Sequence, residues 1–289
     1  MRCDLHVHTN RSGMCTIPLL RHVCRESYNE PLAVYEKLKR LGMDLVTFTD
    51  HDSIDAAEAL RSRPDFFLSE EVTCRMPSGT ELHMGVYDIC DRDHIEIQRR
   101  RDDFESLTAW LRERGLFFSA NHVFSSLTGR RVLADFECFE RDFPALETRN
   151  GHMLARANEN AAALADLAGK AEVGGSDAHA MASVGCAWTA VPRARSRQEY
   201  LDGLRRGQGR VRGGTGSYWK LTRDIIAIGG CMVRDNPSTL PLAPLSVFVP
   251  FITAGNYLVE GFFARWWMSR YLRARTERFA TVEVAEVAA

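Results

Sequence analysis

Six of the nine histidines lie in short apolar segments spread along the chain, each with the length and composition of a β-strand. These segments are CDLHVHT, VTFTDHD, TELHMGV, FFSANHV and VGGSDAH, and their histidines are His6, His8, His51, His83, His122 and His179. Glu71 in LSEEVTC and Asp177 add carboxylates in the same setting. Histidine and carboxylate side chains are ligands of Zn²⁺, Mn²⁺ and Fe²⁺. If these segments converge on one point, they form a site for more than one metal ion. Such a site requires a fold that brings strands distant in the sequence together.

Strand-like and helical patterns alternate along most of the chain. We expect strands near 3–8, 44–50, 66–75, 81–89, 116–123, 144–150, 171–177 and 184–191. We expect helices at 31–42, 53–62, 93–114, 153–169 and 196–206, the third of which ends at Gly115, a helix stop signal. Repeated strand–helix units favour an α/β fold with a parallel sheet, and this number of units favours closure into a barrel.

Each candidate ligand lies at the C-terminal end of its strand, which in β/α barrels is the face that carries the active site. Asp4, His6 and His8 alternate along one strand, so their side chains share a face. Asp177 and His179 share a face for the same reason. One H-x-H pair could be two surface histidines, but six concordant strand ends make an accidental arrangement improbable.

The composition fits a soluble enzyme. The 289 residues, 45% of them hydrophobic, can form one barrel or one domain with an appendage, and a net charge of −1 gives no nucleic-acid signature. None of the eight cysteines forms a C-x-x-C pair, which indicates reduced thiols. Met1 leads directly into a ligand strand and leaves no room for a secretory signal. We therefore expect a cytoplasmic protein.

The motifs DLHVHT, TDHD, SEEVT, ELHMGV, ANHVF and GSDAH occur in this order within residues 1–214. This set resembles the PHP (polymerase and histidinol phosphatase) superfamily of metal-dependent phosphoesterases. The resemblance implies a distorted (β/α)7, TIM-like barrel over 1–214 that holds two or three divalent ions (Mn, Fe or Zn), followed by an appendage at 215–289. It implies one ion on His6, His8, Glu71 and Asp177, a second on Glu71, His83 and His122, and a third on His51 and His179.

The third site departs from the family pattern. Members with a full trinuclear centre usually carry another Asp or His five or six residues after the second motif histidine. Gly13 and Met14 occupy these positions here, and the nearest candidates are Asn10 and Cys15. We therefore expect the third ion to bind weakly, or to be completed by water and substrate phosphate.

The chemistry follows from the metals. A carboxylate-bridged pair of divalent ions lowers the pKa of a shared water and clamps the oxygens of a phosphate ester. The candidate catalytic residues are His51, His179 and Asp177, and either histidine could protonate the departing alkoxide if a third ion does not occupy both.

Other polar residues near the motifs have two interpretations. Asp4, Asp50 and Asp52 could orient ligating imidazoles, although an N-cap role for Asp52 and a buried hydrogen-bonding role for Asp4 fit as well. Residues placed to contact substrate are Arg11, Arg149, Asn150 and His152, although His152 could equally cap the helix that follows.

The composition changes near the C-terminus. No charged residue occurs from 236 to 259, and the following EGFFARWWMSRYLRAR mixes aromatic residues with arginines. Pro250, Asn256 and Glu260 argue against a transmembrane helix, which needs roughly 20 apolar residues in a row. Residues 236–275 fit a peripheral membrane contact. They fit packing over the barrel or a homodimer interface equally well, and we favour that second interpretation.

These observations favour a metal-dependent phosphoesterase acting on a small phosphate monoester or nucleotide. The same centre would serve a phosphodiester or a cyclic phosphate. A non-catalytic, metal-stabilised module recruited through its C-terminal tail is a further alternative. A C–N hydrolase of the amidohydrolase type normally brings a metal-bridging lysine, and no strand end carries one.

Overall fold

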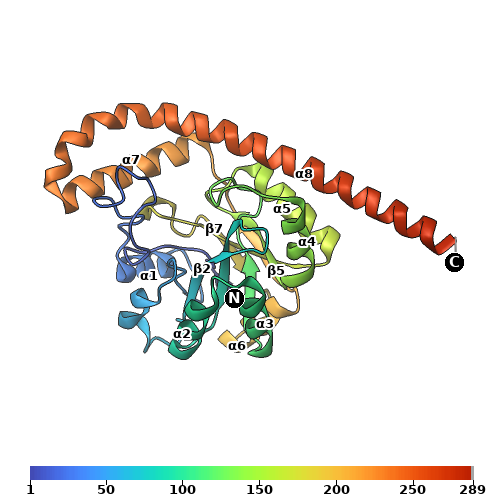
Figure 1. Ribbon diagram of the computed structural model, residues 1–289. Coiled ribbons are helices and arrows are strands. Elements are labelled where there is room, and N and C mark those ends of the chain that lie inside the picture. The colour runs from blue at the N-terminus through green and yellow to red at the C-terminus, as the bar shows by residue number, and fades with distance from the viewer. Residues whose placement is uncertain (288–289) are drawn as a thin grey trace.

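The computed structural model describes residues 1–287, with side chains described up to Arg278, and its body contains two β-sheets (Figure 1). The larger sheet has the order β2 (Ser69–Arg75), β3 (Glu81–Tyr87), β4 (Phe117–Ala120), β5 (Ala145–Asn150) and β6 (Ala171–Gly175). The smaller sheet has the order β1 (Arg2–Cys3), β7 (Ala187–Ala190) and β8 (Arg210–Gly213). The protein therefore has the expected mixed α/β fold.

The expectation of parallel strands throughout is wrong. β4, β5 and β6 pair in parallel, but β2–β3 and β3–β4 pair antiparallel. Residues 76–80 explain the first of these pairs, because a five-residue connection is too short for the crossover that parallel strands need. Gly79, at φ +82°, supplies the left-handed conformation of this turn.

No closed barrel is found among residues 1–287, where strand ladders form two separate sheets. The predicted strand at 44–50 makes only single parallel bridges, Val46 with Phe66 and His51 with Glu71. A third bridge joins Val7 to Ala178, and the Thr49 amide donates to the Val7 carbonyl at 3.0 Å. Isolated bridges thus connect the ligand segments 5–8, 46–51 and 176–178 to one another and to β2.

The helices lie where the apolar periodicity predicts them, with two differences. The expected helices are α1 (Pro31–Arg40), the 3₁₀ helix η1 (Asp55–Leu60), α5 (Ala155–Ala168) and α6 (Arg197–Arg205). The predicted helix at 93–114 is two helices, α2 (Asp91–Arg100) and α3 (Phe104–Glu113), because the Asp103 side chain accepts a hydrogen bond from the Ser106 amide and starts a new helix. Helix α4 (Leu133–Asp142) was not predicted, and a short 3₁₀ helix, η2 (Met181–Ser183), follows the last ligand segment.

Three buried clusters hold the ligand segments in place, one of which contains Leu5, Leu45 and Val173. The largest joins the five-stranded sheet to helices α2–α5 and contains Val72, Met84, Val86, Phe118, Leu146, Ile97, Leu111, Phe136 and Leu164. The second lies under α1 and contains Val7, Val34, Leu38, Val46 and Phe66. Alternation along each strand sends these apolar side chains into the core and the intervening residues to the other side. Core packing of the neighbouring apolar residues therefore fixes the position of each ligand segment.

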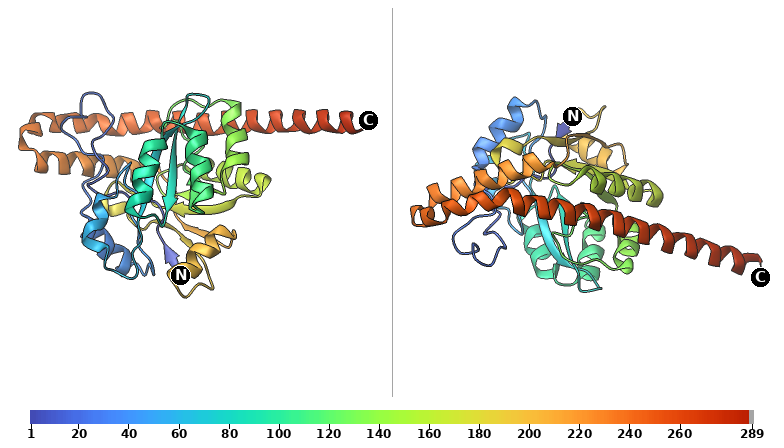
Figure 2. Two further views of the ribbon diagram at one scale, coloured as in Figure 1. Left: turned by 60° about the horizontal axis from the view of Figure 1, so that its bottom comes forward. Right: turned by 90° about the horizontal axis from the view of Figure 1, so that it is seen from above.

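The C-terminal part is helical and lies against the body. It comprises α7 (Tyr218–Asp235), the 3₁₀ helix η3 (Pro237–Phe248) and the long α8 (Val249–Val287), which crosses the whole molecule (Figure 2). Ala264 and Tyr271 of α8 are buried in the largest core cluster, and Trp267 packs against it. Within the described residues, one helical stretch, Pro237–Arg278, is long and apolar enough to cross a membrane by length and composition, with a mean hydropathy of 1.5.

Candidate metal centre

The structure brings together all eight predicted metal ligands. They come from the chain after β1 (His6, His8), the segment 46–51 (His51), β2 (Glu71), β3 (His83), the end of β4 (His122) and the segment after β6 (Asp177, His179). His6, His8, Glu71 and Asp177 are buried. Several overlapping triads of their nitrogen and oxygen atoms lie close enough to share an ion.

Glu71 stands at the centre of this cluster. Its Oε2 atom lies 3.1 Å from His6 Nε2, 3.3 Å from His51 Nδ1 and 3.4 Å from His8 Nε2. Ligand atoms about 2.1 Å from a tetrahedral ion lie about 3.4 Å from one another. These separations therefore suit atoms that share a metal ion.

The second carboxylate oxygen of Glu71 faces a different set of imidazoles. Its Oε1 atom lies 3.3 Å from His122 Nε2 and 3.7 Å from His83 Nδ1. The Asn121 amide donates to the same oxygen at 2.8 Å and fixes the carboxylate plane. Glu71 is thus oriented as a carboxylate that could bridge two ions.

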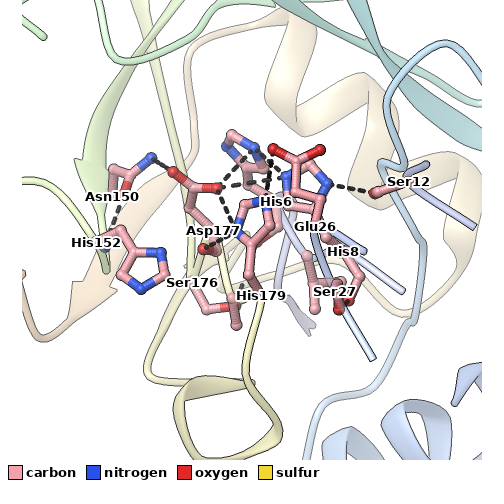
Figure 3. Close-up of polar contacts among 12 residues, drawn as sticks. His6, His8, Ser12, Glu26, Ser27, Asn150, His152, Ser176, Asp177 and His179 are labelled. Atoms are coloured by element: carbon pink, nitrogen blue, oxygen red, sulfur yellow. Dashed lines mark hydrogen bonds and ion pairs between the residues drawn. The ribbon is translucent and has the colours of Figure 1, made fainter. Parts of the chain in front are cut away.

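Asp177 completes the first group of ligands. Its Oδ1 atom lies 3.4 Å from both His6 Nε2 and His8 Nε2 (Figure 3). Its Oδ2 atom accepts a hydrogen bond from the Asn150 amide at 2.9 Å. Asn150, predicted to contact substrate, instead uses its amide to orient Asp177, and its Oδ1 accepts the backbone amides of His152 and Met153. Its polar groups are therefore already occupied.

Glu26 is a candidate ligand that the sequence interpretation missed. Its Oε1 atom lies 3.5 Å from His51 Nε2 and 3.5 Å from His179 Nε2. The Glu26 amide donates to the Gly13 carbonyl at 3.1 Å, so the first loop folds back and Glu26 lies beside the position where a ligand was expected. Neither proposed substitute occupies this place: Asn10 donates to Glu30, and the Cys15 amide bonds to the Cys24 carbonyl.

Glu147 was also missed by the sequence interpretation. It orients the ligands from the side that faces away from Glu71. Its carboxylate contacts His6 Nδ1 at 2.8 Å and accepts from the His122 amide at 3.0 Å and from Asn150 at 2.9 Å. A carboxylate on the far nitrogen of a ligating histidine fixes the tautomer and the ring orientation. The sequence signal was a glutamate in the middle of the predicted strand 144–150.

Asp50 acts on a candidate ligand through an intervening hydroxyl. Ser12 Oγ lies 2.9 Å from His8 Nδ1 and donates to Asp50 Oδ1 at 2.7 Å. Thr9 adds its amide and hydroxyl to the same carboxylate. The prediction that Asp50 helps to orient an imidazole therefore agrees with the geometry.

Asp4 and Asp52 do not contact an imidazole. Asp4 accepts the backbone amides of Ser176 at 2.8 Å and Gly185 at 3.0 Å, which ties the first ligand strand to the last. Burial raises the pKa of Asp4 to about 6 despite these hydrogen bonds. Asp52 accepts the Thr73 amide and pairs with Arg101 at 2.5 Å, and it is no N-cap because η1 begins at Asp55.

Two candidate ligands have unusual backbone conformations. His122 has φ 31° and Asp177 has φ 50°, in a region that residues other than glycine rarely adopt. Such strain persists only where the surrounding structure enforces it, and it clusters at functional sites. The turn at each residue ends the strand and aims the side chain into the cluster.

The buried polar atoms of the cluster fit a bound cation. Glu71 Oε2, His51 Nδ1 and His179 Nε2 have no hydrogen-bond partner within the described part of the chain, and leaving them so is costly. Burial favours the uncharged form of Glu71, but His6 and the other facing imidazoles outweigh it and hold the pKa of Glu71 well below its usual value.

His83 has the opposite character. Burial, reinforced by His51 and His122, lowers the pKa of His83 to about 3, so its ring is neutral as a metal ligand must be. A mixed set of imidazole and carboxylate ligands suits Mn²⁺, Fe²⁺ or Zn²⁺.

The remaining predicted contacts lie at the edge of the cluster. The His152 ring stacks on His179 with centroids 5.9 Å apart, and its Nε2 lies 3.5 Å from Asp224 Oδ2 of α7. Arg149 is half-buried, and its Nε atom has no hydrogen bond to the described residues. Arg11 is exposed on the first loop. Of the predicted substrate contacts, His152 and Asn150 thus lie against candidate ligands, His179 and Asp177 respectively.

Comparison with known proteins supports the family assignment. A family model described as PHP-associated (PHP_C) matches residues 155–208, which include Asp177 and His179. No curated protein matches the chain in sequence.

Solved structures resemble the fold at low sequence identity. PsfC from Pseudomonas syringae PB-5123 is 18% identical with a TM-score of 0.54, and the match covers 80% of this chain and 97% of PsfC. The lesion-specific endonuclease PfuEndoQ from Pyrococcus furiosus is 15% identical with a TM-score of 0.50, covering 73% of this chain and 58% of PfuEndoQ. An amidohydrolase from Chromobacterium violaceum, with bound sulfate and no metal, is 15% identical with a TM-score of 0.48, covering 73% and 97%. The PHP-associated match over residues 155–208 agrees with the resemblance of this chain to the PHP superfamily, and PsfC and PfuEndoQ are similar to it in fold.

Proposed function

We propose that the protein is a metal-dependent phosphoesterase that hydrolyses a small organic phosphate monoester or a nucleotide. The observation that carries the proposal is the arrangement of Glu71, whose two oxygens face two different groups of imidazoles. One carboxylate that joins two ion positions would hold two ions close together, and paired ions stabilise both the attacking and the leaving oxygen of a phosphate ester.

We assign the ligands to three positions. The first would be held by His6, His8, Glu71 and Asp177, the second by Glu71, His83 and His122, and the third by His51, His179 and Glu26. When bound, divalent ions such as Mn, Fe or Zn would polarise the phosphate and lower the pKa of a water. With Glu26, the third position has the carboxylate that Gly13 and Met14 cannot provide.

The chain's own groups would bind and protonate the substrate. Burial disfavours a charged His51, but Glu71 and Glu26 outweigh it and raise the pKa of His51 to about 9. A protonated His51 or His179 beside the phosphate could therefore donate its proton to the departing alkoxide when no third ion takes its nitrogen. His152, against His179, is placed to contact the substrate outside the cluster.

A small substrate agrees with the charge of the chain. PfuEndoQ is an endonuclease, which makes hydrolysis of a phosphodiester or cyclic phosphate the second candidate. The net charge of −1 gives this protein no electrostatic attraction for a nucleic acid. Amidohydrolase-type chemistry with a bridging lysine has no support, because Lys37 and Lys39 lie in α1, Lys170 precedes β6 and Lys220 lies in α7.

We further infer that residues 1–214 form the catalytic unit and 215–289 an appendage. The single bridges Val7–Ala178 and His51–Glu71 support a distorted barrel, because they place the ligand segments between β6 and β2. The (β/α)7 description then refers to the order of strand-like segments and helices along the chain. It does not mean that neighbouring strands are joined by continuous hydrogen-bonded ladders.

A panel of phosphate esters tests the proposal. Mn-loaded protein should release phosphate from an aryl phosphate monoester, His83→Ala should abolish release, and the exposed His22→Ala should leave it unchanged. Turnover confined to diesters or cyclic phosphates would select the second candidate. A metal-replete protein without turnover on any ester would contradict the proposal and favour a non-catalytic module.

A further inference from the structure

The C-terminal helices expose an unusually apolar surface, which we call the hairpin tip and define as residues 237–263. It forms the turn between α7 and α8 at the edge of the molecule (Figures 1 and 2). Its exposed apolar residues are Leu240, Leu245, Val247, Phe248, Phe251, Ile252, Tyr257, Leu258, Val259 and Phe262. Phe251 is 73% exposed and Leu258 72% exposed. Contiguous exposure on this scale marks an interaction site rather than an ordinary monomer surface.

The exposed residues of α8 form one stripe. Phe251, Leu258, Phe262 and Trp266 follow one another at spacings of seven and four residues, which places them on one face of a helix. The opposite face carries Ala264 and Tyr271, which are buried against the body. One side of α8 is therefore packed on the body, and its exposed outer side is apolar as well.

Arginines border this stripe. Arg265, Arg270 and Arg273 are exposed on the turns that follow the hairpin tip, and the Arg270 guanidinium lies 5.5 Å from the Trp266 ring. The acidic residue within the tip, Glu260, accepts hydrogen bonds from the Ser126 amide and therefore faces the body. An apolar stripe with tryptophan and arginine at its margin matches the boundary between acyl chains and anionic headgroups.

The geometry favours a helix that lies on a membrane over one that crosses it. Residues 264–278 of α8 contact the body through Ala264, Tyr271, Arg275 and Arg278, which leaves residues 249–263, about 22 Å of helix at 1.5 Å per residue. The hydrocarbon core is about 30 Å thick. In addition, α7 ends with Arg234 and Asp235, and Asp235 pairs with Arg25 at 3.6 Å. Charged groups thus lie at the turn that a spanning hairpin would bury deepest.

We propose that the hairpin tip docks on the surface of an anionic lipid bilayer. The outer stripe of α8 enters the headgroup region, and Arg265, Arg270 and Arg273 contact lipid phosphates. A second copy of the chain fits less well, because the tip offers these arginines no acidic partner: Glu260, the one acidic residue in 237–263, is already bonded to Ser126. The inference is independent of the proposed catalytic function.

Vesicle co-sedimentation of the full chain tests this docking. The protein should sediment with phosphatidylcholine vesicles that contain phosphatidylglycerol, and weakly with phosphatidylcholine alone. The triple variant Phe251→Glu, Leu258→Glu, Phe262→Glu should lose at least 10-fold in vesicle affinity. The matched control, Leu32→Glu, Ile95→Glu, Leu167→Glu, changes exposed apolar residues on the body and should bind as the wild type does.

A second measurement uses the wild type alone. Bromine-labelled lipid should quench the tryptophan fluorescence, because Trp266 lies at the margin of the stripe. Absence of sedimentation and quenching, or triple-variant binding equal to the wild type, would overturn the proposal. A wild-type dimer that ignores vesicles and that the triple variant converts to monomer would assign the surface to a second copy instead.

Discussion

At the scale of single residues, Glu71 is the side chain on which the cluster depends. Its two oxygens face His6, His8 and His51 on one side and His83 and His122 on the other. We predict that Glu71→Ala removes both core ions, a larger loss of metal than any single histidine change causes, and that it lowers phosphatase activity to background. Elemental analysis and an aryl phosphate assay measure both effects.

The neighbouring glutamate provides the control for this variant. Glu70 points away from the cluster and contacts His94 at 2.9 Å and Gln98 at 2.8 Å. Glu70→Ala should therefore keep its metal ions. Retained activity in Glu71→Ala, with loss in Glu70→Ala, would mean that the motif alignment at SEEVT is wrong.

Glu26 carries a prediction for the third position. Glu26→Gln should weaken the third ion by at least about 10-fold, since even groups that only orient ligands contribute that much. The two core ions should stay, because the contacts of Glu26 are to His51 and His179. Metal titration of the variant beside Glu30→Gln, whose carboxylate bonds to Asn10, tests this. Simultaneous loss of all ions, or no loss, would contradict the assignment.

At the scale of elements, α8 is anchored to the body through Tyr271. Its side chain is 1% exposed, its ring packs on Phe136, and its hydroxyl donates to Glu140. We predict that Tyr271→Ala lowers the free energy of unfolding by about 3–5 kcal/mol, as removal of a buried aromatic ring does. Tyr257→Ala, on the exposed tip, should change it little. Urea unfolding of both variants gives the comparison, and equal stabilities would contradict the packing.

The anchoring of α7 has a pH signature. Burial opposes the charged form of Asp224, but hydrogen bonds with His152, Ser183 and Arg223 outweigh it and lower the pKa to about 2. Because the folded pKa lies below the usual 3.8, this group stabilises the fold by about 2 kcal/mol at neutral pH. That contribution should be lost as the pH falls from about 4 toward 2. Denaturation curves should show this loss in the wild type and a flatter dependence in Asp224→Asn, and parallel curves would refute it.

At the scale of the whole molecule, the alternation of apolar and polar residues predicted the candidate ligands that lie on strands or directly after them. His6, His8, Glu71 and Asp177 lie on strands or just after them, where alternation and core packing fix the side-chain direction. Glu26 lies in a loop that has no periodic pattern of apolar residues. Its position depends on the backbone hydrogen bond to Gly13, which no local sequence pattern predicts.

One error in the predicted fold has an equally local cause. The connection at 76–80 is a tight turn rather than a crossover, which reverses β3. Pro250, which argues against a transmembrane helix in the sequence, does not interrupt the long α8. It lies at the second residue of that helix, where proline is tolerated because the first amides of a helix have no partner.

The number of metal ions per chain tests the account most directly. Elemental analysis of protein purified gently, then equilibrated with Mn²⁺ and desalted, should give two tightly held ions and a third that exchanges more readily, because His51, His179 and Glu26 are only half-buried whereas His6, His8 and Glu71 are buried. One ion or none, under conditions that preserve bound metal, would contradict a multinuclear centre built around Glu71.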